Sequence, residues 1–386
     1  MKYLIFCVLF ICSILLLGSC AGKYRLDRDD LTIVSAWPFA RGKADGKGSL
    51  VSGRFPGKLD VIWQQKFGDK PAGPLTIYHG ALIYPGTKKK ARFFDTETGR
   101  SKGVVKAKGV PRTGLVIQDS VAYFGVVSKR NRLYGIDLIN RKRVLRTSVK
   151  DPAPGSIIVG NRLLVSSGDG KLVAYDLESH LAAWDFSAEG RFVASATCGH
   201  EKVFQPDDRG ILHAVSIDDG QEIFATQVAG PIVSPVAVGD KVYAADVLGN
   251  VYAINPESGD IIWQVEIGGP VWTSPAIAGG RLFVGHSGGE VVALDASSGE
   301  ELWRFETSEV VRASPLVVDD WVVVGTMGGK LFLLDAIEGK LVASKELEGA
   351  IFFPPVTDGE RLFVATQSGR VICFGEQDEE YEQADH

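Results

Sequence analysis

Histidine and cysteine can bind a metal ion, and cysteine and serine can act as nucleophiles, so their spacing in this 386-residue chain indicates whether it carries such a site. The histidines are scattered, and none stands in a His-x-x-x-His or His/Cys arrangement that would place two ligands on one ion. The sequence therefore predicts no metal site and suggests no Ser-His-Asp set. Each histidine is expected to be solvated or to make a single hydrogen bond: His79, His180, His200, His213, His286 and His386.

The first 20 residues carry the one cysteine with a clear chemical context. After Lys2, an apolar run extends from Tyr3 to Leu17 and is followed by Gly18, Ser19 and Cys20. The run has about 15 residues, fewer than the roughly 20 that a membrane-spanning helix needs. Small residues then precede the cysteine, as a signal peptidase requires. These features predict a signal peptide over residues 1–19.

Leu17-Gly18-Ser19-Cys20 resembles the lipobox of bacterial lipoproteins. The resemblance implies that Cys20 is acylated and becomes the first residue of the mature chain. An ordinary signal peptide with a chance cysteine, or a short membrane anchor, is the alternative. In a cell with two membranes, Ala21 in place of Asp implies sorting to the outer membrane, with the folded domain in the periplasm. Residues 20–57, rich in Gly, Lys, Ser and Pro from Ser35 onward, are predicted to be a tether.

Composition excludes one class of partner. Hydrophobic residues make up 45% of the chain, glycine occurs 45 times and the formal net charge is −5. These values are typical of a turn-rich globular protein. Because there is no basic excess to hold a phosphate backbone, nucleic acid is not an expected partner.

A repeat of about 40 residues organises the rest of the chain. Pro235, Pro275, Pro315 and Pro355 are each 40 residues apart. Each is followed by a short apolar run, a turn, a second strand and a glycine-containing hairpin. The third strand of each copy ends at a polar turn residue, 39 to 42 residues after the previous one: Asp95, Asp137, Asp176, Ser216, Asn255, Asp295 and Asp335.

Each repeat is predicted to form four antiparallel strands, which is one blade of a β-propeller. Eight sets of three strands can be counted, and the last, ending near Phe374, lacks a fourth strand. The segment from Asp60 to Gly68 matches Asp260 to Gly268 in register and supplies the missing strand. We therefore predict an all-β, eight-bladed propeller over residues 58–376, closed by an N-terminal strand and followed by an acidic disordered tail at 377–386. Cys198 and Cys373 fall in blades roughly opposite each other, so both are expected to be free thiols.

A tryptophan follows the turn in the best-preserved repeats and is predicted to cover the gap between neighbouring blades. Examples are Ala293-Leu-Asp-Ala-Ser-Ser-Gly-Glu-Glu-Leu-Trp303 and the matching run that ends at Trp263. This motif resembles the Ala-x-Asp-x-x-Thr-Gly-x-x-x-Trp docking motif of quinoprotein repeats. The resemblance covers residues 59 to 374 and is weaker before Lys150. The predicted docking residues are Trp63, Trp184, Trp263 and Trp303.

Two families that use this repeat imply different functions. In quinoprotein dehydrogenases the ring holds pyrroloquinoline quinone over a calcium ion, with an aspartate base and usually a disulfide between adjacent cysteines. This chain lacks adjacent cysteines, is much shorter, and offers no Glu, Asn and Asp set that matches the calcium ligands. The lipobox, tether and compact ring are more similar to the BamB family, whose members help β-barrel proteins to fold at the outer membrane.

That similarity implies a non-enzymatic scaffold that uses no cofactor and binds protein partners in the cell envelope, in a barrel-assembly complex. BamB-type proteins carry longer loops on one face, whereas the gaps between repeats are short here. A quinone-dependent oxidoreductase and a sensor domain for a small ligand are the alternatives.

One set of residues is predicted to form a binding surface at a mouth of the central channel. Its members lie three residues before the recurrent prolines or at the matching place in other repeats. The alternative is that most of them pack between blades. They are Arg112, Phe192, Ile232, Trp272, Arg312 and Phe352.

Overall fold

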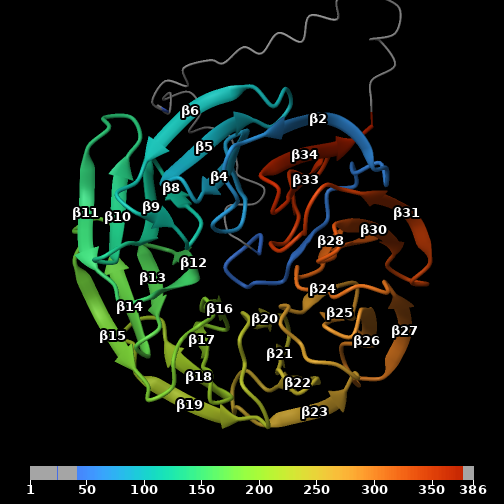
Figure 1. Ribbon diagram of the computed structural model, residues 1–386. Helices are drawn as coiled ribbons and strands as arrows, with labels where there is room; N and C mark the ends of the chain where they lie inside the picture. Colours follow the sequence, from blue (N-terminus) through green and yellow to red (C-terminus); the bar gives the residue numbers. More distant parts are fainter. Residues whose placement is uncertain (1–23, 25–40, 377–386) are drawn as a thin grey trace, which may run out of the picture.

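The computed structural model describes Tyr24 and residues 41–376, and all regular structure in that part of the chain is β-strand. The strands form eight sheets around a ring (Figure 1). This arrangement confirms the predicted eight-bladed propeller. Within the described ranges, no helix is long and apolar enough to cross a membrane. The predicted signal peptide, Cys20 and the acidic tail lie outside the described residues.

We number the blades 1 to 8 along the chain and give their strands from the centre outward. Blade 1 consists of β3 (Thr76–Tyr78), β4 (Ala81–Gly86), β5 (Lys90–Asp95) and β6 (Ser101–Lys106), and blade 2 of β7 (Val110–Pro111) with β8 (Val116–Gln118), β9 (Val121–Val127), β10 (Arg132–Asp137) and β11 (Arg143–Ser148). Blade 3 consists of β12 (Pro152–Val159), β13 (Arg162–Ser167), β14 (Lys171–Asp176) and β15 (Ala182–Ser187), and blade 4 of β16 (Thr197–Gly199), β17 (Lys202–Pro206), β18 (Ile211–Ser216) and β19 (Glu222–Gln227).

Blade 5 consists of β20 (Ala237–Val238), β21 (Val242–Ala245), β22 (Asn250–Ile254) and β23 (Ile261–Glu266), and blade 6 of β24 (Ala276–Ala278), β25 (Arg281–His286), β26 (Glu290–Asp295) and β27 (Glu301–Glu306). Blade 7 consists of β28 (Leu316–Val318), β29 (Trp321–Gly325), β30 (Lys330–Asp335) and β31 (Leu341–Glu346), and blade 8 of β32 (Val356–Thr357), β33 (Leu362–Ala365), β34 (Arg370–Gly375) and β2 (Asp60–Lys66).

The N-terminal strand closes the ring as predicted. β2 pairs antiparallel with β34 and places Trp63 opposite Cys373. In the same way Trp303 lies opposite Ala293 in blade 6. Residues about 310 positions apart in the chain thus complete blade 8, and no sheet edge is left open between the two ends of the ring.

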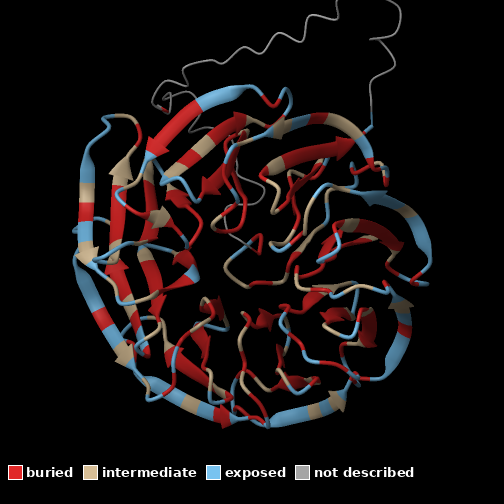
Figure 2. Cartoon of the chain, in the orientation of Figure 1, coloured by how far each residue is buried: buried red, intermediate tan, exposed pale blue. Residues whose placement is uncertain are grey.

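The core consists of apolar layers between neighbouring blades. Side chains on the middle strands are almost all buried, whereas the outer strands alternate between buried and exposed residues (Figure 2). The largest fully buried side chains are aromatic and include Tyr84, Phe204 and Phe363. Cys198 in blade 4 and Cys373 in blade 8 are buried free thiols, as predicted, and burial raises the pKa of both.

The four predicted docking tryptophans make the same contact with the next blade. Each indole Nε1–H donates to a backbone carbonyl 33 residues further along the chain, at 3.0 Å for Trp63 and 3.2 Å for Trp303. The ring lies against the glycine of the next turn. At Gly99, which has a φ of 65°, an added Cβ would lie 2.6 Å from the Trp63 ring. The turn therefore needs glycine for its backbone conformation and for the space that the indole occupies.

Replacement of Trp303 by Ala should lower the free energy of unfolding by about 3–5 kcal/mol, because the indole is nearly buried and its removal leaves a cavity. A drop in Tm on the order of 10 °C is expected for a domain of this size, measured by circular dichroism or calorimetry. Trp272→Ala is the matched control, since Trp272 is 40% exposed. Equal melting of the two variants would contradict the docking role of Trp303.

Residues 41–57 were predicted to belong to the tether, but the structure places them against the ring. The carbonyls of Ala44, Asp45, Lys47 and Gly48 accept hydrogen bonds from the inner strands of blades 4, 5, 6 and 7 in turn. β1 (Ser49–Leu50) then pairs in parallel with β28. This segment lies inside the ring, along the inner edges of four consecutive blades (Figure 1). The folded domain therefore includes residues 41–57.

Arg41 holds the start of this inner segment. Its guanidinium donates to the carbonyls of Pro275 at 2.7 Å and Pro315 at 2.8 Å, and the residue is buried. Burial without a direct carboxylate partner lowers its pKa to about 9. Gly46, with a φ of 66°, lies so close to the inner strand of blade 4 that an added Cβ would be 2.7 Å from Thr197 Cγ2. The glycines that suggested a flexible tether instead allow close contact with the inner strands.

Candidate functional site

Backbone hydrogen bonds establish which positions of the blades are equivalent at the predicted binding surface. The amide of Ile232 donates to the Asp207 carbonyl at 3.2 Å. The amide of Val271, not that of Trp272, makes the corresponding bond to Asp246, at 3.3 Å. Val311 and Ile351 make it in blades 7 and 8. Ile232 is therefore equivalent to Val271, and the proline spacing that aligned Ile232 with Trp272 was misleading.

A shorter turn in blade 5 explains the one-residue offset. Val238 of β20 pairs with Val242, four residues later, whereas Ile277 pairs with Leu282, five residues later. Equivalent positions that precede this turn in blades 5 and 6 are thus 39 residues apart, whereas those that follow it, such as Val242 and Leu282, are 40 apart. The offset of one residue exchanges a buried for an exposed side chain, because Ile232 and its equivalent Val271 are buried whereas the next residue, Trp272, is exposed.

The six predicted residues accordingly separate into groups. Phe192 and Ile232 are completely buried between blades, so for these two the alternative interpretation was correct. Trp272, Arg312 and Phe352 occupy the outward position in blades 6, 7 and 8, and the structure brings these three together. Arg112 is exposed at the start of blade 2 and lies apart from them. It forms an ion pair with Asp151 at 3.3 Å, and Asp151 also binds Arg191 at 3.2 Å.

Trp272, Arg312 and Phe352 form what we call the aromatic–arginine cluster. The Arg312 Cζ lies 4.3 Å from the centre of the Trp272 ring and 6.0 Å from that of Phe352. Both rings are exposed, at 40% and 39%. Within residues 41–376 the Arg312 guanidinium has no hydrogen bond or ion pair, and partial burial lowers its pKa. The cluster therefore offers two apolar ring surfaces and an arginine fork whose donors are free to bind an acceptor.

Exposed aliphatic side chains that the sequence did not single out lie on the same face. Leu248 belongs to a hairpin turn of blade 5 and packs over Gly230 in the loop that enters that blade. Met327, in the corresponding turn of blade 7, donates its amide to the carbonyl of Val310, in the loop that leads to Arg312. Their sequence signal was an apolar residue within a glycine-containing turn. Blades 5 to 8 thus carry an apolar surface around the cluster.

The histidines form no metal site in the described residues, where no three His, Cys, Asp or Glu side chains are grouped to hold an ion. His213 makes one hydrogen bond, between its Nδ1 and the Glu222 carboxylate at 2.7 Å, and its Nε2 lies 3.5 Å from the Asp207 carboxylate. His286 is buried beside Glu290, and burial lowers its pKa.

One stretch, Gly285-His286-Ser287-Gly288-Gly289, matches the Gly-x-Ser-x-Gly pattern of serine hydrolases. It spans the end of β25 and the hairpin turn to β26, whereas a nucleophile elbow joins a strand to a helix. The His286 Nδ1 accepts a hydrogen bond from the Gly288 amide at 3.0 Å, and its Nε2 faces Glu290. Neither ring nitrogen is directed to the Ser287 hydroxyl, so this arrangement does not activate a nucleophile.

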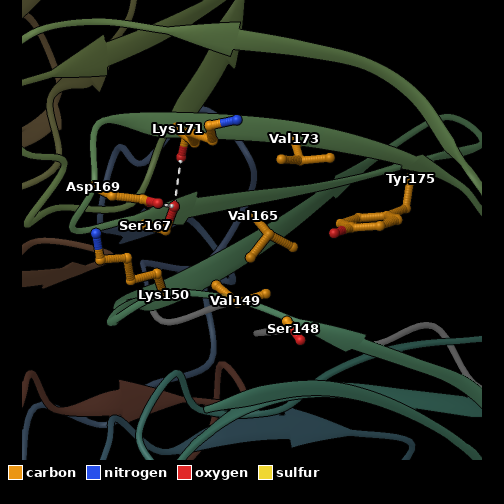
Figure 3. A pocket seen from close by; sticks show the side chains of 9 residues that line it. All are labelled: Ser148, Val149, Lys150, Val165, Ser167, Asp169, Lys171, Val173 and Tyr175. Carbon is orange, nitrogen blue, oxygen red and sulfur yellow. Dashed lines mark hydrogen bonds between the residues drawn. The ribbon is translucent and has the colours of Figure 1, made fainter. Parts of the chain in front are cut away.

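A surface cavity of about 250 Å³ lies between the outer parts of blades 2 and 3 (Figure 3). Its walls are Val149, Val165, Val173 and Tyr175, with Lys150 and Lys171 at the rim. The Ser167 hydroxyl lies 2.7 Å from Asp169 and 3.1 Å from the Lys171 carbonyl. The cavity lies on different blades from the aromatic–arginine cluster, and none of the predicted site residues lines it.

Comparison with protein families identifies the repeat. The family described as outer membrane protein assembly factor BamB matches residues 60–234 and 224–384, which together span most of the chain. The chain belongs to the BamB family. A search of curated proteins gave no match.

Solved structures resemble this BamB-family propeller in fold. BamB from Moraxella catarrhalis is 17% identical, covers 82% of this chain and 100% of its own, and superposes with a TM-score of 0.72. A quinohemoprotein alcohol dehydrogenase from Pseudomonas putida HK5 is 12% identical, with coverages of 91% and 82% and a TM-score of 0.75. A europium-containing methanol dehydrogenase is 11% identical, with coverages of 90% and 99% and a TM-score of 0.74. At these identities the likeness shows the propeller fold alone.

The dehydrogenases of the same fold raise the question of whether a quinone and its metal ion fit this ring. The described side chains contain no group of three carboxylate, histidine or cysteine ligands for the ion. Residues 41–50 lie inside the ring, where they place the Arg41 guanidinium against the inner strands of blades 6 and 7. A buried cation is an unfavourable neighbour for a bound metal ion. The residues present do not fit the cofactor.

Proposed function

We propose that this BamB-family protein is a non-enzymatic scaffold, anchored to the outer membrane through acylated Cys20, whose propeller binds protein partners of β-barrel assembly in the periplasm. The family match supports the envelope role, because that family is described as an outer membrane assembly factor. The lipobox-like run Leu17–Cys20 supports the anchor. The propeller supplies a rigid ring on which short loops present a binding surface.

The aromatic–arginine cluster is the observation that carries the proposal. Tryptophan and arginine are among the residue types that contribute most to the binding energy of protein interfaces. Here the Arg312 guanidinium stacks on the Trp272 ring, and its hydrogen-bond donors are unused. Exposed Val310 lies two residues before Arg312, Met327 donates its amide to the Val310 carbonyl, and exposed Leu248 occupies the corresponding turn of blade 5. An apolar surface with a central cationic fork fits a protein partner that supplies apolar side chains and a carboxylate.

Changing Trp272, Arg312 and Phe352 together to Ala should abolish partner binding while leaving the fold intact. Truncation of one such central residue weakens an interface by about 2 kcal/mol or more, which is roughly thirtyfold in Kd. The measurement is recovery of barrel-assembly proteins with the affinity-purified protein from detergent-solubilised membranes of its own cells. The Tm should change little, because all three side chains are at least partly exposed.

A matched control changes three exposed aliphatic residues of blade 7, Ile337, Leu341 and Val342, to Ala. This control should recover partners as the unaltered protein does. Equal recovery by both triple variants would contradict the assigned surface. A rise in Tm that needs both calcium and pyrroloquinoline quinone, with dye-linked alcohol oxidation, would contradict the non-enzymatic function itself.

A further inference from the structure

Blade 1 lacks the aromatic docking residue that blades 3 to 6 and blade 8 place on their outer strands. Gly103 of β6 lies opposite Phe93, at the position that Trp303 occupies opposite Ala293. Glycine leaves this position without a side chain. The gap between blades 1 and 2 therefore requires apolar material from another part of the chain.

Tyr24 fills this gap. Its ring stacks on Phe93 with 3.8 Å between ring centres and an angle of 8° between the planes, and only 4% of the residue is exposed. Its amide donates to the carbonyl of Val104, the residue after Gly103, at 3.0 Å. Tyr24 packs in the same apolar cluster as Leu138 of blade 2. A residue from the N-terminus thus takes the place of the missing tryptophan.

This contact limits how far Cys20 can lie from the ring. The four residues from Cys20 to Tyr24 span at most about 14 Å when fully extended. An acyl group on Cys20 would therefore hold the outer edge of blades 1 and 2 close to the membrane surface. A tether that was free up to residue 57, as the sequence suggested, would impose no such limit.

The outer strands of these two blades carry a concentration of positive charge. Residues 100–108 and 141–150, which contain β6 and β11, include nine Lys or Arg residues and no Asp or Glu, in a chain of net charge −5. All nine are exposed. Among the described residues, Lys106, Lys108, Arg146 and Lys150 take part in no ion pair. We call this surface the basic edge: Arg100, Lys102, Lys106, Lys108, Arg141, Lys142, Arg143, Arg146 and Lys150.

The geometry points to the basic edge of blades 1 and 2 as the surface that rests on anionic lipid headgroups, with Tyr24 fixing that orientation. This inference rests on the proposed acylation of Cys20. Unpaired lysines and arginines beside a lipid anchor are attracted to an anionic bilayer surface, and each one near the surface favours binding about fivefold. In this orientation the basic edge contacts the membrane surface, and the aromatic–arginine cluster on blades 6 to 8 lies away from the membrane.

Single-thiol labelling of the lipid-anchored protein tests this orientation. Ser101 and Ile261 occupy equivalent positions at the start of the outer strands of blades 1 and 5, and both are exposed. Ser101→Cys and Ile261→Cys are labelled separately with a fluorophore, since the native Cys198 and Cys373 are buried. The proteins are reconstituted in phosphatidylglycerol-containing vesicles that carry a nitroxide on the headgroup. Quenching should be much stronger at position 101 than at position 261.

Two sets of variants separate the contribution of the Tyr24 contact from that of the basic edge. Tyr24→Ala should remove the difference between the two labels, and Tyr24→Phe, which keeps the stacked ring, should preserve it. Lys106→Gln combined with Arg146→Gln should lower, by about 25-fold, the ratio of molecules whose basic edge faces the membrane to molecules in other orientations. Lys340→Gln with Lys345→Gln, a matched pair on blade 7, should leave the ratio unchanged.

The outcomes distinguish the orientation from the anchor. Protein that floats with the vesicles but is quenched equally at both positions overturns the orientation and leaves the anchor in place. Protein that does not float overturns the anchor and the orientation together. A difference between the labels that persists on purely zwitterionic vesicles, or in the Tyr24→Ala variant, overturns the role assigned to the charge or to Tyr24.

Discussion

Deletion of residues 58–68 should destabilise the whole propeller, because it removes the outer strand of blade 8. β2 provides all the hydrogen-bonding partners on one side of β34. Its Trp63 packs against Phe363 of blade 8 and donates a hydrogen bond to the Thr96 carbonyl of blade 1. Its loss therefore removes contacts within blade 8 and between blade 8 and blade 1. The loss of one strand and a buried tryptophan exceeds the roughly 4–5 kcal/mol that only severe single substitutions reach.

The measurement is thermal unfolding together with the soluble yield of the protein. We expect a fall in Tm well beyond that of Trp303→Ala, and aggregation through the exposed edge of β34. A chain without the predicted acidic tail, residues 377–386, is the control for shortening and should melt as the full-length protein does. If the chain without residues 58–68 melts at the same temperature as the control, the closure does not hold the ring together.

Cys20→Ser should release the protein from the membrane, since the thiol is the proposed acyl acceptor. Fractionation should move the protein almost completely from the membrane to the soluble fraction, or leave it as an unprocessed precursor. Mass spectrometry of the unaltered protein should show a mature N-terminus at Cys20 carrying acyl groups. Cys12→Ser, within the predicted signal peptide, is the matched control and should remain anchored. An unmodified mature N-terminus at another residue would rule out the lipoprotein assignment.

The two anchoring features would act together if both predictions hold. Acylation alone would attach the chain without orienting the ring. The contact of Tyr24 with Phe93 would add the orientation, because it joins the N-terminus to one particular edge. The apolar face on blades 5 to 8 would then be presented at a defined angle to the bilayer.

The repeat, the number of blades and the closure of the ring could all be predicted from the order of the amino acids. Each blade repeats the same local pattern of strands, turn residues and apolar positions, so eight copies reinforce one interpretation. The match of Asp60–Gly68 to Asp260–Gly268 located the closing strand because it is a copy of the same pattern. A repeat is visible in the sequence because its signal depends on residues that are close together in the chain.

Which side chains reach the surface, and where the N-terminal segment lies, could be seen only in the folded ring. Ile232 and Trp272 share a distance to a proline, but a turn one residue shorter in blade 5 makes them non-equivalent, so that Ile232 is buried and Trp272 is exposed. Arg41 bonds to carbonyls more than 230 residues away, and Tyr24 fills a gap left by Gly103. These contacts form between segments that repeat no common pattern, so their partners are defined only when the ring has closed and brought them together.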